Sequence, residues 1–272
     1  MAVTAVRNKM IFARSYFEYD SDFYITGNAH SNHPADFIET EFRGEYWQND
    51  GSNAPMIRLD WKGGSTRNIY LVFLTGVKCE EGVVDILLKR NGVTPAAYTI
   101  ENWDPFRGQA CLLVLDSPIT LNGSLDYLEI EFDVASNASV CRISSAIFVD
   151  ISDSSDHIIQ DQIARSPKFS LQALYQIDME ESEDGDAYSY ERETKRWAMS
   201  WGYDKILYSD VMLFLGKLYY EYLSKTCLYI VDPSTDLKAA SSGVWGKMIS
   251  HIPTGEFWGG LRLSGKFVAR EQ

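Results

Sequence analysis

The sequence predicts a mainly β protein in two parts, a β-sandwich followed by a second β domain with one flanking helix. Many short apolar segments are separated by turn residues, the aromatic content is 13%, and only residues 209–223 show a helical pattern of useful length. Aromatic and β-branched residues favour strands. A chain of 272 residues is long enough for one large or two ordinary domains.

The N-terminal part, residues 1–155, is a series of short candidate strands. Segment 125–134, LDYLEIEFDV, alternates apolar and acidic side chains, which indicates a strand with one buried face. Segment 83–90 ends at Asn91-Gly92, a dipeptide typical of tight hairpins because both residues tolerate positive φ. The other candidate strands are 57–61, 69–75, 111–115 and 140–151. Short strands at regular spacing predict a β-sandwich of the jelly-roll type.

The segment 156–168 is polar and has a proline near its end, which indicates a linker between two domains. The second part, residues 169–272, begins with a candidate hairpin. The predicted tip of this hairpin is acidic, and its Asp-Gly pair suits a tight turn. The residues of the tip are Glu183, Asp184, Gly185 and Asp186.

A strand and a helix follow the hairpin. In KRWAMSWGYD, residues 195–204, Trp197, Met199 and Trp201 alternate with small residues, so one face of the strand is strongly apolar. Residues 209–223 start with a serine cap and carry apolar residues at spacings of three and four. Because a helix with one apolar stripe needs a sheet to pack on, we expect a small β-sandwich or barrel sealed by this helix. Further candidate strands are 227–231, 244–251 and 257–268.

Charge and cysteine content exclude several classes of protein. A net charge of −13 and a pI of about 4.8 disfavour specific nucleic-acid recognition. The four cysteines are widely spaced with no CxxC motif, which favours buried reduced thiols over a disulfide framework or a zinc site. The sequence shows no secretory signal core and no apolar run of the ~20 residues that a membrane span needs. We therefore expect no membrane insertion, and synthesis in a cytosol or assembly into a larger particle there.

Motifs for catalysis and metal binding are missing from the sequence. It has no GxGxxG, P-loop, GxSxG or HExxH pattern. His30 and His33 form an HxxH pattern that could bind metal on a helix, but Asn32 and Pro34 favour a loop. We therefore predict a protein without enzymatic activity, catalytic residues, cofactor or metal.

Three tryptophans give a second hypothesis, a carbohydrate-binding β-sandwich that recognises host glycans. Exposed aromatic rings in sandwiches stack on sugars, and polar side chains beside them bind the hydroxyl groups. Trp47, Trp61 and Trp103, with Asp104, fit this pattern. Tryptophan in a sheet protein is more often packed than exposed, so burial is the alternative.

The order of elements in the second part resembles a known family. A hairpin with Asp184-Gly185 at its tip leads to Lys195-Arg196-Trp197 at a strand entry, and a helix and a short strand ending near Asp232 follow. This order resembles the tail-tube-like domain of distal tail and other minor tail, or baseplate, proteins of long-tailed bacteriophages. The N-terminal half resembles the galactose-binding-like or jelly-roll modules that such proteins often carry.

The resemblance implies a structural virion protein of a phage tail tip or baseplate. Copies of the chain would form a homo-oligomeric ring that extends or caps the tail tube, and the hairpin at 183–186 would contact neighbouring copies. The expected partners are other copies, adjacent tail tube or baseplate proteins and, through the sandwich, host surface glycans. DNA would only pass through the lumen, whose acidic wall would avoid phosphate contacts. The expected location is the virion, after assembly in the host cytoplasm.

Overall fold

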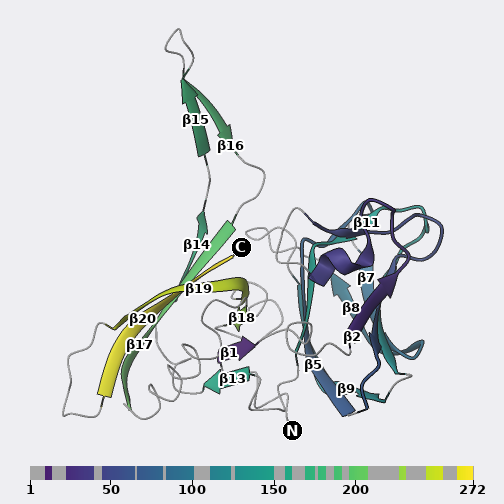
Figure 1. Cartoon of the computed structure of the whole chain (residues 1–272), viewed down its shortest axis with the longest axis horizontal. Helices are drawn as coiled ribbons and strands as arrows, with labels where there is room; N and C mark the ends of the chain where they lie inside the picture. Colours follow the sequence, from purple (N-terminus) through teal and green to yellow (C-terminus); the bar gives the residue numbers. More distant parts are fainter. Residues whose placement is uncertain are drawn as a thin grey trace. The chain divides into compact units, whose positions relative to one another are not determined.

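The computed structural model describes residues 10–13, 23–39, 45–64, 66–81, 84–100, 111–123, 126–149, 157–160, 169–174, 177–181, 187–191, 196–207, 227–230, 243–253 and 262–271. These ranges contain strands β1 to β20 and one short 3-10 helix, η1 (Ala35–Glu39), so the prediction of a mainly β protein is confirmed (Figure 1). The predicted helix at 209–223 lies outside the described residues.

The chain divides into two compact units. Unit 1 contains Met1–Ala164 and Cys227–Gly243, and unit 2 contains Arg165–Thr226 and Val244–Gln272. The predicted division was a sandwich at 1–155, a linker at 156–168 and a second domain at 169–272, and the structure differs from it at two places. The predicted linker contains β13 (His157–Gln160), and β18 (Cys227–Ile230) groups with unit 1. Both strands pair with β1 (Met10–Ala13), a long-range pairing that a local polarity pattern does not reveal.

One sheet of unit 1 has five antiparallel strands in the order β2-β4-β10-β7-β8. Its burial alternates along β4 and β10, so one face is buried and the other is partly exposed. The turn between β7 and β8 has φ values of 51° at Asn91 and 76° at Gly92, which confirms the predicted hairpin. The strands are β2 (Phe23–Gly27), β4 (Met56–Trp61), β7 (Val84–Arg90), β8 (Val93–Ile100) and β10 (Tyr127–Asp133).

A second sheet of unit 1 has three strands in the order β12-β5-β9. The last seven residues of β5 and all five of β12 are buried. The predicted strand 140–151 is interrupted at Ser144, whose N–H donates to the carbonyl of Thr75. It therefore divides into β12 and a short β11, which belongs to a small sheet of order β3-β11-β6. The strands are β3 (Trp47–Gln48), β5 (Thr66–Thr75), β6 (Lys78–Cys79), β9 (Cys111–Asn122), β11 (Cys141–Ile143) and β12 (Ser145–Val149).

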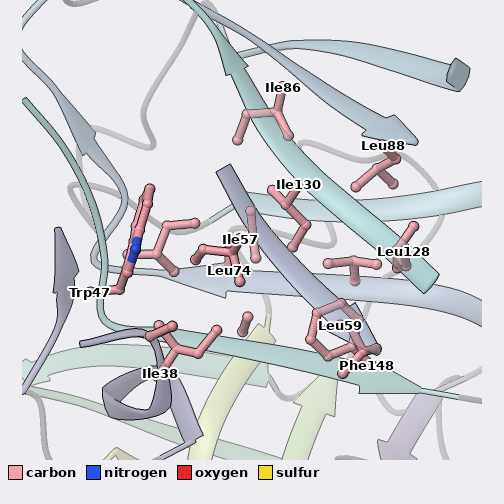
Figure 2. Close-up of a cluster of buried hydrophobic side chains, with 14 of the residues drawn as sticks. Ile38, Trp47, Ile57, Leu59, Leu74, Ile86, Leu88, Leu128, Ile130 and Phe148 are labelled. Atoms are coloured by element: carbon pink, nitrogen blue, oxygen red, sulfur yellow. The ribbon is translucent and has the colours of Figure 1, made fainter. Parts of the chain in front are cut away.

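The core of unit 1 lies between the five-stranded sheet and the three-stranded sheet β12-β5-β9. Figure 2 shows Leu59 and Ile130 of the five-stranded sheet together with Leu74 and Phe148 of the three-stranded sheet in one apolar cluster. Complete burial of such a side chain stabilises a fold by about 1.5–3 kcal/mol. The two sheets are therefore held face to face as a β-sandwich. The cluster also contains Ile38, Ile57, Leu88 and Leu128.

Unit 2 contains strands in the order β19-β20-β17-β14. Strand β17 (Arg196–Leu207) includes Trp197, Met199 and Trp201, so the predicted aromatic strand is confirmed. Strands β15 (Ile177–Glu181) and β16 (Ala187–Glu191) form a separate antiparallel hairpin, and the predicted tip at 183–186 lies outside the described residues. The other strands are β14 (Phe169–Leu174), β19 (Gly243–Pro253) and β20 (Arg262–Glu271).

Candidate functional site

Two of the tryptophans predicted to bind sugar are in the core. Trp47 is 0% exposed and Trp61 is 1% exposed. The prediction that these rings stack on a glycan is wrong, because the alternation along β4 turns Trp61 inward and Trp47 packs on Phe132 of β10. Trp103 and Asp104 lie outside the described residues.

A group of polar and aromatic side chains lies next to the buried Trp47. Its members come from the loop after β2, from the residues at and before β3, and from β11. All five are half-buried, so each has one part fixed by the protein and another part open to solvent. We call this group the His33–Tyr46 cluster, and it consists of His30, His33, Tyr46, Gln48 and Arg142.

Backbone hydrogen bonds bring these distant segments together. The N–H of His30 donates to the carbonyl of Gln48 over 2.7 Å, and the N–H of Gln48 donates to the carbonyl of His33 over 3.3 Å. The N–H of His33 donates in turn to the carbonyl of His30 over 2.8 Å. Arg142 is opposite Gln48 in the antiparallel pairing of β11 with β3. The main chain therefore fixes the positions of four of the five members.

The side chains of the cluster form a row of flat groups. The imidazole of His33 stacks on the ring of Tyr46 with centroids 4.1 Å apart and an angle of 17° between the planes. The ring of His30 lies 5.7 Å from that of His33. The guanidinium carbon of Arg142 is 5.0 Å from the centroid of Tyr46, and its Nε donates to Oε1 of Gln48 over 2.9 Å. This bond holds the guanidinium in one orientation, and its terminal N–H groups donate to no group within the described ranges.

The electrostatics of the cluster favour a neutral imidazole. Burial first, and then the charges of His30 and Arg142, lower the pKa of His33 below its ordinary value. At neutral pH His33 therefore offers one hydrogen-bond donor and one acceptor, and Arg142 supplies a permanent positive charge.

The backbone behind the cluster is held by Asn49. Its Oδ1 accepts the N–H of Cys141 over 2.8 Å, and its Nδ2 donates to the carbonyl of Ser139 over 2.9 Å. Asn49 and the two residues that it binds, Ser139 and Cys141, are all buried. Because a buried amide with satisfied partners restricts local motion, the strand ends that carry Gln48 and Arg142 are fixed.

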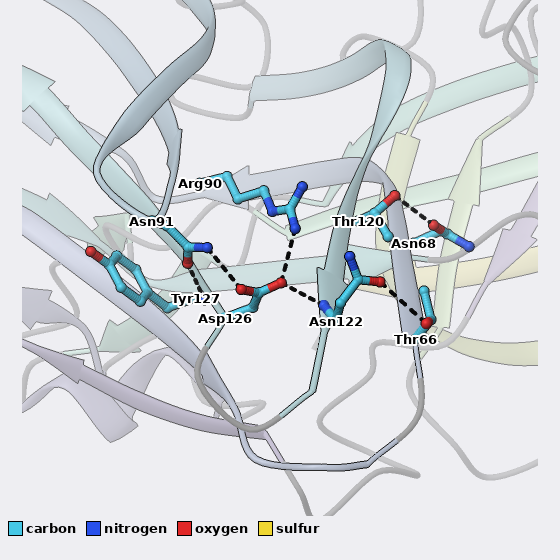
Figure 3. A network of polar contacts seen from close by, with 8 residues as sticks. All are labelled: Thr66, Asn68, Arg90, Asn91, Thr120, Asn122, Asp126 and Tyr127. Carbon is cyan, nitrogen blue, oxygen red and sulfur yellow. Dashed lines mark hydrogen bonds and ion pairs between the residues drawn. The ribbon is translucent and has the colours of Figure 1, made fainter.

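A different polar network lies where β7 ends and β10 begins, and it is structural. Figure 3 shows the Asp126 carboxylate accepting from the N–H of Asn122 at 2.6 Å, from the Asn91 amide at 2.8 Å and from Arg90 at 2.9 Å. These three bonds, that of Asn122 first, lower the pKa of Asp126. Because protein groups occupy both carboxylate oxygens, the network closes two turns and presents no open ligand site.

The HxxH pattern does not form a metal site in the described part of the chain. His30 and His33 face each other across a tight turn, and no three histidine, cysteine or acidic residues gather closely enough within the described ranges to hold an ion. The same ranges contain no helix of the length and apolarity required to cross a membrane.

Sequence patterns indicate part of the cluster. The HxxH pattern draws attention to His30 and His33, and EYWQND contains both Tyr46 and Gln48. The assumption that the tryptophan of EYWQND is exposed is the error, because Trp47 points inward and its neighbours point outward. Nothing near Arg142 in the sequence indicates that it joins Gln48, which is 94 residues away.

Comparisons with known proteins identify no family. No family model matches the sequence, and no curated protein is significantly similar to it. Among solved structures, the family 32 CBM (carbohydrate-binding module) of Clostridium perfringens NanJ in complex with galactose has a TM-score of 0.35 at 14% identity, over 50% of this chain and 98% of that chain. CpGH89CBM32-5 from Clostridium perfringens, in complex with GalNAc-β-1,3-galactose, has a TM-score of 0.34 at 12% identity, over 47% and 96%.

CBM32-1 from a family 31 glycoside hydrolase of Clostridium perfringens has a TM-score of 0.34 at 11% identity, over 48% of this chain and 95% of that chain. TM-scores below 0.5 do not establish a common fold.

Proposed function

We propose that unit 1 is a carbohydrate-binding β-sandwich and that the His33–Tyr46 cluster is its sugar site. The observation that carries the proposal is the row of flat, half-buried side chains formed by His33, Tyr46 and Arg142 on a fixed backbone. Sugars combine apolar C–H surfaces with many hydroxyl groups. Aromatic rings provide apolar contact area, and planar polar groups provide donors and acceptors in fixed directions.

Each polar member has a role that suits a hydroxyl ligand. The terminal N–H groups of Arg142 donate as a planar pair to adjacent hydroxyl oxygens. Neutral His33 both donates and accepts, as a hydroxyl group does. The five members include no pair of carboxyl groups of the kind that glycosidases use for acid–base chemistry. The cluster therefore supports binding without hydrolysis of the sugar.

The proposal is tested by titrating the full-length protein with a panel of monosaccharides and measuring binding by NMR or calorimetry. Galactose and N-acetylgalactosamine belong in the panel because they are the sugars named for the solved structures above. We expect saturable binding that weakens at least tenfold, or about 1.4 kcal/mol, in Arg142→Ala. His33→Ala and Tyr46→Ala are expected to weaken binding similarly.

Arg58→Ala is the matched control. Arg58 also lies over a tyrosine, 3.6 Å from the ring centroid of Tyr127, but on the outer face of the five-stranded sheet. Binding is expected to be unchanged in this variant. Absence of saturable binding across the panel, or equal losses in Arg58→Ala and Arg142→Ala, would contradict the sugar site.

We also propose that unit 2 mediates assembly into a phage tail ring, because its β15–β16 hairpin lacks a strand partner within the described residues. Strands β15 and β16 pair with each other from Ile177↔Glu191 to Glu181↔Ala187. A two-stranded hairpin alone is marginally stable in water, so a surface that receives it is expected. A second copy of the chain is the occupant that the resemblance to minor tail proteins implies.

Native mass spectrometry at rising protein concentration tests the assembly. We expect closed oligomers of the full chain, and their loss when residues 177–191 are replaced by a short turn. A variant with Arg142→Ala keeps the hairpin and serves as the control, with oligomers expected at wild-type levels. A protein that remains monomeric at all concentrations, alone and with tail extracts, contradicts the ring but not the sugar site.

A further inference from the structure

Two buried cysteines of unit 1 are directly opposite each other on neighbouring strands. Cys79 in β6 pairs with Cys141 in β11, and their Sγ atoms are 3.0 Å apart. The residues are 62 positions apart in the sequence. A disulfide bond has an S–S length of about 2.05 Å, so a small side-chain rotation is enough to bring the sulfur atoms into bonding distance.

The backbone around the pair suits a cross-strand bond. The N–H and carbonyl of Cys141 both bind Asn49, on the side of β11 that faces β3. The ladder bond on the other side runs from the N–H of Glu80 to the carbonyl of Val140. Cys79 and Cys141 therefore occupy a non-hydrogen-bonded pair, in which Cα atoms are about 4.5 Å apart and side chains are closest. That separation falls within the range of about 4.4–6.8 Å found for disulfides.

We propose that Cys79 and Cys141 form a disulfide when the protein meets a low-molecular-weight disulfide such as oxidised glutathione. The thiolate of Cys79 attacks one sulfur of glutathione disulfide, which gives a mixed disulfide and releases one glutathione thiolate. Cys141 then loses its proton to solvent and attacks Sγ of Cys79, which releases the second glutathione. Two protein thiols are oxidised and one glutathione disulfide is reduced to two thiols.

The order of attack follows from the exposure of the two thiols. Cys79 is 7% exposed and Cys141 is 0% exposed, so the external disulfide reaches Cys79 first. Burial and the contact with Cys79 raise the pKa of the Cys141 thiol, which makes it a poor first nucleophile. Strand β6 has two residues and β11 has three, so a local opening that admits glutathione breaks few ladder bonds.

The disulfide would lie directly behind the proposed sugar site but does not depend on it. Cys141 precedes Arg142, and Asn49, which binds the backbone of Cys141, follows Gln48. A bond between β6 and β11 would hold the strand that carries Arg142 in place in the folded protein and would restrict the unfolded chain.

The experiment uses the wild-type full chain, purified in reductant and then equilibrated with glutathione buffers of increasing oxidised fraction. After alkylation in denaturant, we expect the intact protein to lose two alkylatable thiols of four, and non-reducing peptide mapping to find Cys79 joined to Cys141. The oxidised form is expected to melt about 5 °C or more above the reduced form. Cys227→Ser is the matched control and should oxidise in the same way.

Either of two results would overturn the proposal. One is a folded protein that keeps four alkylatable thiols in the most oxidising buffer, or gains only a glutathione adduct. The other is a bridge that involves Cys111 or Cys227. Since the primary measurement is made on the wild-type chain, it does not rely on the folding of a cysteine variant, and its outcome is independent of sugar binding.

Discussion

The two large sheets of the sandwich share one core but differ on their outer faces. In the five-stranded sheet, β10 alternates strictly, so Leu128, Ile130 and Phe132 are buried and the acidic residues between them are partly exposed. In the three-stranded sheet, Phe73 and Ile147 lie opposite each other, outside the shared core, and are at most 1% exposed. The chain itself therefore covers the outer face of this sheet.

Strand β5 of the three-stranded sheet does not keep a regular alternation of inward and outward side chains. Ile69, Val72 and Leu74 all belong to the shared core, so inward and outward positions change places between 69 and 72. The pairing of β5 with β9 changes register between Ile69 and Leu71 in the same region. A sheet with both faces covered tolerates such an irregularity, because apolar side chains are buried on either side.

The largest effect is expected for Phe73→Ala. Removal of this ring from the covered outer face should destabilise the protein by about 3–5 kcal/mol, through lost burial and a cavity. Leu87→Ala, on the half-buried outer side of β7, should cost about 1 kcal/mol or less. Urea unfolding followed by tryptophan fluorescence measures both. Similar losses in the two variants would show that the outer faces are equally solvated in solution.

Neighbouring residues of β10 test the alternation of the five-stranded sheet. Ile130→Ala is expected to cost about 2–5 kcal/mol, because its side chain is 1% exposed in the core. Glu129→Gln should change stability by no more than about 0.5 kcal/mol, because burial already raises the pKa of this carboxyl and disfavours its charge. The same urea experiment applies, and comparable losses at 129 and 130 would contradict the observed strand face.

Asp126→Asn should cost about 1–2 kcal/mol at pH 7, because the charged carboxylate accepts bonds from Arg90, Asn91 and Asn122. The lowered pKa of Asp126 sets the pH dependence. Its contribution is fully present above the unfolded value of about 3.9 and is lost as the pH falls through the lower folded value. Thermal melts from pH 7 to 2 should therefore show wild type and variant converging below about pH 4. A gap that is constant with pH would exclude a role for the charge.

A small effect is also expected for Lys89→Ala on the partly exposed face of the five-stranded sheet. Its Nζ lies 2.6 Å from Oε2 of Glu131 across the β7–β10 pair. Such pairs near the surface contribute about 1 kcal/mol or less, and salt screens them. Urea unfolding at low and high salt measures the contribution of this ion pair to the free energy of unfolding. A loss above about 2 kcal/mol that persists in high salt would show that this face is covered.

The contrast between the sheets also explains what could be predicted from the sequence. In LDYLEIEFDV the alternation predicts the strand and its buried face together, because acidic residues cannot occupy the core. The runs in β5 and β12 predict strands but not faces, because both sides are apolar. The pairing of β1 with β13 and β18 joins segments with no common local pattern.

The candidate site was predicted only in fragments. The sequence directs attention to Trp47, but it does not say which ring of the pair Tyr46 and Trp47 points outward. That choice depends on the pairing of β3 with β11, which sets Trp47 opposite Ile143 and Gln48 opposite Arg142. The contribution of Arg142 arises only from tertiary structure, and no spacing rule anticipates it.

Gly76, which follows β5, limits how this protein can change over generations. Its φ is +59°, and a Cβ at this position would be 2.0 Å from Oγ of Ser144 and 2.6 Å from its Cβ. Any other amino acid would strain its own backbone and displace the residue that begins the turn into β12. Alanine at 144 would leave the contact with its Cβ, and glycine at 144 would relieve the clash but not the strain. As descendants of this gene diverge, position 76 is expected to remain glycine while the surrounding loops drift.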